Sequence, residues 1–217
     1  KDHPYGEVQM KSDIENITID ACKKYYETYF RPNISYLVIV GDITVEDAKK
    51  LTEKYLGSWE KADVPEHKYD MPAPAKGVRV AFVNKPGAVQ SVIKVIYPLD
   101  YKVGAPDAAA VSVMSSIFGG AFSSYLNANL REDKAYTYGA RGGVRADNRV
   151  GSFNAGASVR NEVTDSSVIQ FLFEMNHIIN EKPSQADLDR IKNNMNGGFA
   201  LSLENDQTIA RFALNIE

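Results

Sequence analysis

The hydrophobic and polar positions along the chain follow two different periods. Segments with apolar residues at helical spacing alternate with short apolar runs that are rich in β-branched residues. The first pattern predicts amphipathic helices and the second predicts strands. Helices are expected at 18–30, 44–57, 106–118, 123–133, 164–182 and from 184 to beyond 203. Strands are expected at 35–42, 78–84, 90–98, 136–144 and 151–159.

Polar residues mark the places where several of these helices begin. Thr44 stands three positions before Asp47, and Ser184 stands three positions before Asp187. This spacing is typical of a helix N-cap followed by an acidic residue in the first turn. Thr164 is expected to cap a third helix, because a threonine side chain can accept a hydrogen bond from a free backbone N–H group.

A proline-rich stretch divides the chain. Residues 60–76 contain three prolines and no hydrophobic periodicity, which is typical of a linker. We therefore expect a domain boundary here, with one domain in 1–59 and another in 77–217. The elements of the second domain follow the order β-β-α-α-β-β-α-α. This order predicts an α+β fold with an antiparallel or mixed sheet and helices packed on one face.

Composition limits the classes of function. Apolar residues make up 44% of the 217 positions and charged residues 24%, as in an ordinary globular protein. The net charge is −3 and no cluster of Lys and Arg stands alone, so we expect no nucleic-acid partner. The single cysteine, Cys22, allows no internal disulfide. That fits the cytoplasm and the bacterial periplasm equally, and the compartment stays open.

The two ends of the sequence indicate a piece of a longer protein. It begins with KDHPYGEVQM, which lacks both a starting methionine and the apolar segment of a signal peptide. It stops at IARFALNIE, inside a helical apolar pattern that has no cap. No apolar run approaches the roughly 18 residues that cross a bilayer. We expect a soluble chain without a membrane partner.

Motifs for a catalytic zinc site or an activated nucleophile are absent from the sequence. Zinc peptidases place ligands on one helix face as H-E-x-x-H or H-x-x-E-H, and His3, His67 and His177 fit neither pattern. His177 follows Glu174 by three positions, but a carboxylate-bridged site needs a second such pair. A packed or half-exposed histidine is therefore expected. Cys22 has no motif around it, which favours a small buried residue.

One segment, LREDKAYTYG, combines a cation with phenols. Its pattern predicts that a helix ends near Asp133 and that Tyr136, Tyr138 and Ala140 then share one face of a strand. Arg131 and Tyr138 are seven positions apart. A guanidinium can bind a peptide carbonyl or a carboxylate, and a phenol can donate to an oxygen that gains charge in acyl transfer. A surface ion pair for Arg131 and a core position for Tyr138 are the alternative interpretations.

Four separated segments carry a family resemblance. They are HPYG, YYETYFRPNISYLVIVGDI, VNKPGAVQS and SSIFGGAFSSYLNANLREDKAYTYGARGG. In this order they resemble the pitrilysin or insulinase family of zinc metallopeptidases, which includes mitochondrial processing peptidase and insulin-degrading enzyme. The family shows a glycine stretch, then SSRL, then LRE, then a tyrosine and a glycine. The resemblance covers nearly the whole chain. It implies that 1–59 are the C-terminal part of a first, zinc-type domain and that 77–217 are a second domain, truncated at its C-terminus.

The resemblance implies a role in a chamber that two similar halves enclose, on one chain or two. In the family, one half binds zinc through H-x-x-E-H and a distant glutamate. The opposing half supplies an arginine that holds the substrate backbone and a tyrosine that stabilises the oxyanion, and these match Arg131 and Tyr138. The glycine stretch that contacts substrate corresponds to Gly119 and Gly120, although helix termination explains both glycines equally well. The arginine of SSRL is Tyr125 here.

We therefore expect part of an insulinase-type zinc metalloendopeptidase that acts on peptides or unfolded polypeptides. Zinc is expected in the intact protein or in a partner half. This chain alone is expected to bind no catalytic zinc and to cleave nothing. One alternative is a non-catalytic assembly homologue, since the core subunits of a respiratory complex resemble the family. Another is a generic α+β binding domain. An H-x-x-E-H motif on the parent chain or on a partner would favour the peptidase.

Overall fold

The structure is a computed structural model that describes residues 3–73 and 76–216. Residues 1, 2, 74, 75 and 217, which belong to the predicted domains and linker, lie outside these ranges. The chain divides into two compact units: Lys1–Asp70 together with Gly197–Glu217, and Met71–Asn196. All four candidate site residues belong to the second unit.

The first unit is helical in the described residues. Its elements are η1 (Pro4–Gly6), α1 (Lys11–Glu15), α2 (Ile19–Tyr29), η2 (Pro32–Ile34), α3 (Val45–Leu56) and α8 (Asp206–Ile216). The predicted helices at 18–30 and 44–57 are confirmed. Thr44 Oγ1 accepts a hydrogen bond from the Asp47 N–H group at 3.1 Å, so the predicted cap is present. Cys22 is exposed on α2, and its predicted burial is wrong because no residue of α2 is buried.

Two of the five predicted strands do not form. Residues 35–42 and 78–84 pair with no other strand among the described residues. Their apolar side chains are left exposed, as Val78 at 96% and Phe82 at 84% show. A strand needs a neighbour to complete its backbone hydrogen bonds, and no such neighbour lies in the described part of the chain. The strand predictions for 35–42 and 78–84 are therefore wrong for this chain.

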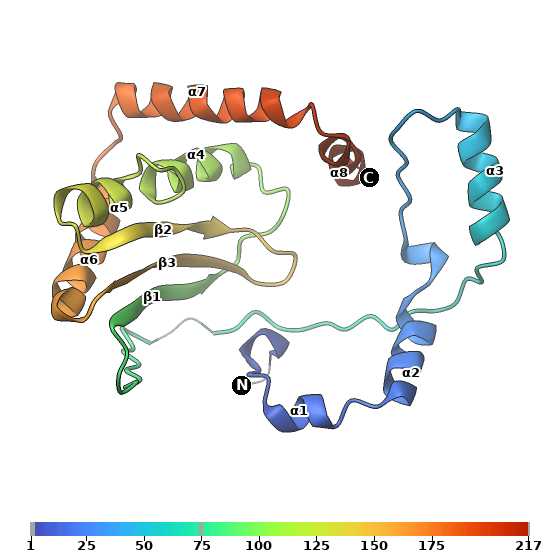
Figure 1. The fold of residues 1–217 in the computed structure, drawn as a ribbon, viewed down its shortest axis with the longest axis horizontal. Coiled ribbons are helices and arrows are strands. Elements are labelled where there is room, and N and C mark those ends of the chain that lie inside the picture. The colour runs from blue at the N-terminus through green and yellow to red at the C-terminus, as the bar shows by residue number, and fades with distance from the viewer. Residues whose placement is uncertain (1–2, 74–75, 217) are drawn as a thin grey trace. The chain divides into compact units, whose positions relative to one another are not determined.

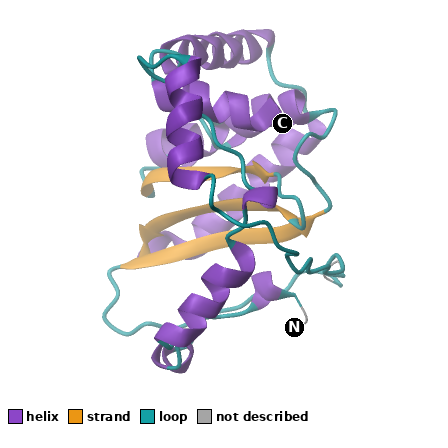
Figure 2. Ribbon diagram, turned by 90° about the vertical axis from the view of Figure 1, so that its right-hand side faces the viewer, coloured by secondary structure: helices purple, strands orange, loops and turns teal. Residues whose placement is uncertain are grey.

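The second unit contains one antiparallel sheet. Its strands are β1 (Gln90–Leu99), β2 (Thr137–Arg145) and β3 (Gly151–Arg160), in the spatial order β1-β3-β2. They lie side by side as one layer (Figure 2). The predicted strands at 90–98, 136–144 and 151–159 are confirmed. The α+β class is also confirmed, with one strand fewer than the predicted order.

The helical segments of this unit are α4 (Ala108–Phe118), α5 (Tyr125–Asn127), the π-helix η3 (Ala128–Asp133), η4 (Asn161–Val163), α6 (Thr164–Asn180) and the first part of α7 (Gln185–Ser202), whose residues from Gly197 on belong to the first unit. Ser184 Oγ accepts a hydrogen bond from the Asp187 N–H group at 3.1 Å, which confirms that cap. Thr164 is the first residue of α6 rather than its cap, because its hydroxyl donates to the Asn161 carbonyl at 2.8 Å. The last predicted helix does not run past 203, since α7 ends at Ser202.

The core of the second unit lies between one face of the sheet and the helices α4, α5 and α6. Alternate strand residues point into it, and they meet buried side chains from each helical segment. Figure 1 shows α4 and α5 lying over β2 and β3. The buried members are Ile93, Phe118, Leu126, Leu130, Ala140, Phe153, Ala155, Ala157, Val159 and Phe171, each at most 8% exposed. This packing fixes the helices that carry Arg131 and the strand that carries Tyr138 to one common core.

Candidate functional site

The outer edge of β2 is closed by the helical segments. Because β2 is an edge strand, the N–H groups of alternate residues point away from β3 and lack a strand partner. Three acceptors satisfy them: Asn127 Oδ1 accepts from Ala140 at 2.8 Å, the Gly119 carbonyl from Gly142 at 3.3 Å, and Ser115 Oγ from Val144 at 3.1 Å.

The N-terminal end of β2 contains a β-bulge. Thr137 pairs with Val159 and Ala140 pairs with Ala157, so three steps along β2 oppose two steps along β3. The Thr137 hydroxyl donates to the Ser158 carbonyl at 2.7 Å and accepts from the Gly139 N–H group at 3.1 Å. These two bonds hold the extra residue in place.

The bulge turns the Tyr138 side chain away from the core. Tyr138 is 93% exposed, whereas Ala140 is fully buried and Tyr136 packs against the core. The prediction that these three residues share one face is therefore wrong. A bulge inserts one residue and shifts the alternation of side chains along the strand. The core position that was the alternative for Tyr138 is excluded as well.

Arg131 lies in the π-helix, where the Lys134 N–H group donates to the Asn129 carbonyl five residues back at 2.9 Å. Its side chain is 32% exposed, and its Nε lies 3.5 Å from Glu132 Oε1. The guanidinium carbon also lies 4.3 Å from the centre of the Phe122 ring. The surface ion pair is thus present, and a cation–π contact with Phe122 additionally restrains the guanidinium group.

Gly119 and Gly120 end α4 and approach their neighbours closely. A Cβ on Gly119 would lie 2.3 Å from the Gly142 nitrogen, and one on Gly120 would lie 3.0 Å from Ser116 Cα. The Gly120 carbonyl accepts a hydrogen bond from Arg141 Nη1 at 2.7 Å. Helix termination and close packing therefore account for both glycines, and their contact with a substrate stays a prediction.

Asn127 connects the segments that carry these residues. It is 2% exposed, and its Nδ2 donates to the Ala121 carbonyl at 3.3 Å while its Oδ1 accepts from Ala140. Arg131 and Tyr138 themselves make no hydrogen bond or cation–π contact with each other within the described ranges. Sequence reasoning missed Asn127, because its two partners are backbone groups, which leave no pattern of residue types.

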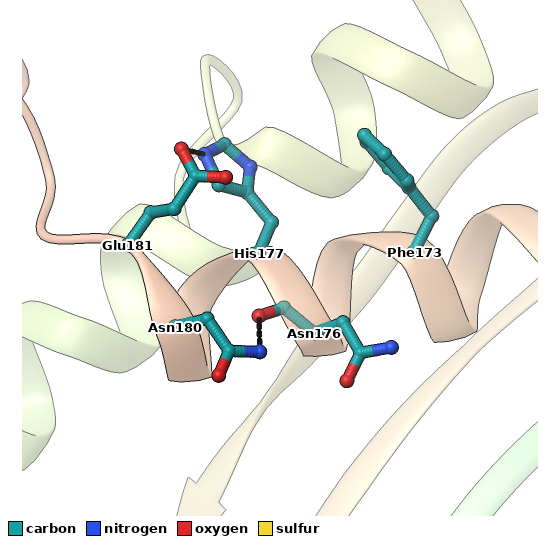
Figure 3. Close-up of a pocket in the computed structure, with 5 residues that line it drawn as sticks. All are labelled: Phe173, Asn176, His177, Asn180 and Glu181. Carbon is teal, nitrogen blue, oxygen red and sulfur yellow. Dashed lines mark hydrogen bonds and ion pairs between the residues drawn. The ribbon is translucent and has the colours of Figure 1, made fainter.

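A second polar group lies on α6. Glu174 is 5% exposed and accepts a hydrogen bond from Asn129 Nδ2 at 2.7 Å. His177 Nδ1 lies 3.2 Å from Glu174 Oε2, and its Nε2 lies 3.6 Å from Glu181 Oε2. The imidazole also stacks on Tyr125 with ring centres 4.8 Å apart. The prediction of a packed, half-exposed histidine is confirmed, and Figure 3 shows it beside Glu181 on the helix surface.

The donor set of the described residues does not fit a catalytic zinc ion. Zinc needs three or four His, Cys or carboxylate ligands converging on one point. Across 3–73 and 76–216 no group of three or more such residues is arranged to hold a metal. The His–Glu group on α6 has both ring nitrogens directed at carboxylates instead.

The described residues also contain no helix that combines the length and the apolar character that a bilayer span requires.

Comparison with known proteins identifies relatives that match most of the chain. The family model described as "Peptidase M16 inactive domain" matches residues 16–195. The zinc protease PqqE of Helicobacter pylori is 26% identical over 223 residues, which cover 96% of this chain and 48% of that protein. The chain thus spans about half the length of this relative.

Solved structures show the same fold. A protease from Helicobacter pylori superposes with a TM-score of 0.79 and 24% identity, over 93% of this chain and 49% of the other. The periplasmic protease PqqL from Escherichia coli superposes with a TM-score of 0.75 and 18% identity, over 96% of this chain and 23% of the other. At these identities the structures establish a common fold.

Proposed function

Because this chain belongs to the peptidase M16 family and matches its inactive-type domain, we propose that it supplies the substrate-binding and oxyanion-stabilising side of a zinc metalloendopeptidase. Membership of this family excludes the alternative of a generic α+β binding domain. The activity of the whole protein is part of the proposal, since the chain spans about half of its curated relative.

The exposure of Tyr138 is the observation that supports this role most directly. The side chain is 93% exposed, and its hydroxyl has no hydrogen-bond partner within the described residues. Aromatic side chains contribute to stability by burying their rings, and the bulge prevents that here. A phenol held outward on a rigid strand is available to a ligand, as a group that donates to a substrate must be.

The two side chains would act on a peptide in different ways. The Tyr138 hydroxyl would donate a hydrogen bond to the carbonyl oxygen that gains negative charge during cleavage. Arg131 would hold a backbone carbonyl of the substrate, and its cation–π contact with Phe122 would help to keep the guanidinium in place. Gly119 and Gly120 would border the bound peptide. The zinc would come from a zinc-bearing half, on the same chain or on another.

The remaining features of the proposal concern organisation. Residues 1–59 would complete a preceding domain, 60–76 would link it, and 77–217 would form the substrate-binding domain. The partners would be peptides or unfolded polypeptides and the zinc-bearing half, without nucleic acid or membrane. The compartment would be cytoplasmic or periplasmic, and the similar PqqL structure is that of a periplasmic protease.

Cleavage of an unstructured peptide pool by the full-length protein, with any second chain that completes it, tests this function. We expect a zinc chelator to stop cleavage and Tyr138→Phe to slow turnover by about 2 to 4 kcal/mol of transition-state stabilisation. Tyr136→Phe is the matched control. It also removes a tyrosine hydroxyl, two residues before Tyr138, but the Tyr136 side chain packs against the core. A loss below threefold in Tyr138→Phe would overturn the role of this residue.

A non-catalytic assembly role is the second candidate. The observation that favours it is the matching family description, which names an inactive domain. If the complete, folded protein cleaves no peptide when zinc is supplied, the assembly role is favoured. A chelator-sensitive peptidase that depends on Tyr138 would exclude it.

A further inference from the structure

We propose that Asn127 is a positioning residue, which sets where Arg131 and Tyr138 stand relative to the turn that follows α4. The inference rests on the proposed function, because the positions of these two side chains matter most if they bind a substrate. Asn127 itself would touch no substrate. It would act through the backbone of the segments that do.

Both ends of the Asn127 amide are used. Oδ1 accepts from the Ala140 N–H group at 2.8 Å, and Nδ2 donates to the Ala121 carbonyl at 3.3 Å. The side chain is 2% exposed. A buried amide is costly unless both its donor and its acceptor are paired. The orientation of the amide is also determined, since an N–H group can only donate to it and a carbonyl can only accept from it.

The two backbone partners of Asn127 lie next to the candidate site residues. Ala140 is the first residue that resumes normal pairing after the bulge, two positions beyond Tyr138. Ala121 follows the glycine pair at the end of α4. Arg131 stands four positions after Asn127 in a continuous helical segment, although its second part is π-helical. One buried side chain therefore fastens the glycine turn, the helix of Arg131 and the strand of Tyr138 to one another.

The chain offers a matched comparison at the other end of the same strand edge. Ser115 Oγ accepts from the Val144 N–H group at 3.1 Å, just as Asn127 Oδ1 accepts from Ala140. Asn127→Ala and Ser115→Ala each remove one acceptor from an outward N–H group of β2. Only the first of these acceptors lies beside Tyr138. A residue that merely stabilised the edge would give the same result at both positions.

The first measurement compares the kinetics of the two variants in the complete protein. It uses conditions in which both variants have the same free energy of unfolding. Asn127→Ala is expected to lower kcat by roughly tenfold or more, because small misplacements of catalytic groups have large effects on rate. KM should change less than kcat. Ser115→Ala is expected to keep kcat within about twofold of the wild type. Equal losses of kcat in both variants would overturn the proposal.

The second measurement does not depend on activity. Hydrogen exchange followed by mass spectrometry should show faster exchange at 138–140 in Asn127→Ala, with 143–145 unchanged, and the reverse in Ser115→Ala. Unchanged exchange at 138–140 in Asn127→Ala would overturn the proposal whatever the kinetics show. If the wild type cleaves no peptide, or Tyr138→Phe is fully active, the proposed function fails. The exchange pattern then decides alone whether Asn127 positions the bulge.

Discussion

The carbonyl oxygen of Ala135 accepts a hydrogen bond from Arg160 Nη1 at 3.0 Å, and Ala135 itself has a left-handed backbone with φ of +53°. The next residue closes the π-helix, because the Tyr136 N–H group donates to the Leu130 carbonyl at 2.8 Å. Arg160 is the last residue of β3, so this hydrogen bond connects the turn between Arg131 and Tyr138 to the sheet. A side chain at a left-handed position destabilises the fold, and the hydrogen bonds of Ala135 and Tyr136 offset this strain.

We expect Ala135→Gly to stabilise the protein by about 0.5 to 1 kcal/mol, since glycine removes the left-handed strain but adds freedom to the unfolded chain. Urea or thermal unfolding of the full-length protein measures the change. Ala109→Gly is the control, because the same substitution on an exposed part of α4 should destabilise by up to about 1 kcal/mol. Destabilisation by Ala135→Gly would show that the left-handed turn carries no strain.

Arg131→Lys tests the geometry of the guanidinium. Lysine keeps the charge but loses the planar fork and the guanidinium contact with the Phe122 ring. We expect the peptide KM of the complete protein to rise roughly tenfold with a smaller change in kcat, as for a lost substrate contact. Arg145→Lys, at an exposed position of β2, should leave both constants near the wild-type values. A wild-type KM in Arg131→Lys would mean that charge alone suffices or that Arg131 binds no substrate.

Gly119→Ala should destabilise the protein whatever its function. The new Cβ would lie 2.3 Å from the Gly142 nitrogen, and neither backbone can yield without moving α4 away from β2. The expected loss is about 1 to 3 kcal/mol in the free energy of unfolding. Gly197→Ala serves as the comparison, because a Cβ there meets no atom within 4 Å on α7. That variant should gain up to about 1 kcal/mol, and equal effects at both positions would contradict the close approach.

Asp187→Asn tests the cap of α7 through pH. Hydrogen bonds from Ser184 and Arg190 hold the pKa of the Asp187 carboxyl below its ordinary value of 3.8. The unfolded chain therefore takes up this proton first, and the stabilising contribution is fully present above pH 3.8 and is lost as the pH falls through the lowered pKa. The wild type should be more stable than Asp187→Asn at about pH 6, and the difference should shrink towards about pH 3. A constant difference across this range would contradict the assignment.

Several features of the site could be predicted because they depend on local residue types. Ser184 predicts the start of α7. The alternating residues after Asp133 predict the end of the helix that carries Arg131. The strand that carries Tyr138 is likewise recognisable from its composition. In each case the deciding interaction lies within a few residues of the chain, so the local sequence contains the necessary information.

Other features depend on partners far away in the chain. The bulge that exposes Tyr138 arises from pairing with β3 and from the bond between Thr137 and the Ser158 carbonyl. Asn127 binds two backbone groups, which any residue type would provide. The failed strand at 78–84 shows the converse, since its residues have the right pattern but no neighbour among those described. Period and composition cannot report interactions of these kinds.

The acceptors along the outer edge of β2 also limit how this sheet can be extended. An extended polypeptide joins a sheet by pairing with free N–H and C=O groups of an edge strand. At Ala140, Gly142 and Val144 those N–H groups are already occupied by Asn127, Gly119 and Ser115. An added strand would have to displace these acceptors, so the edge of the sheet at β2 is protected from the edge-to-edge aggregation that open strands invite.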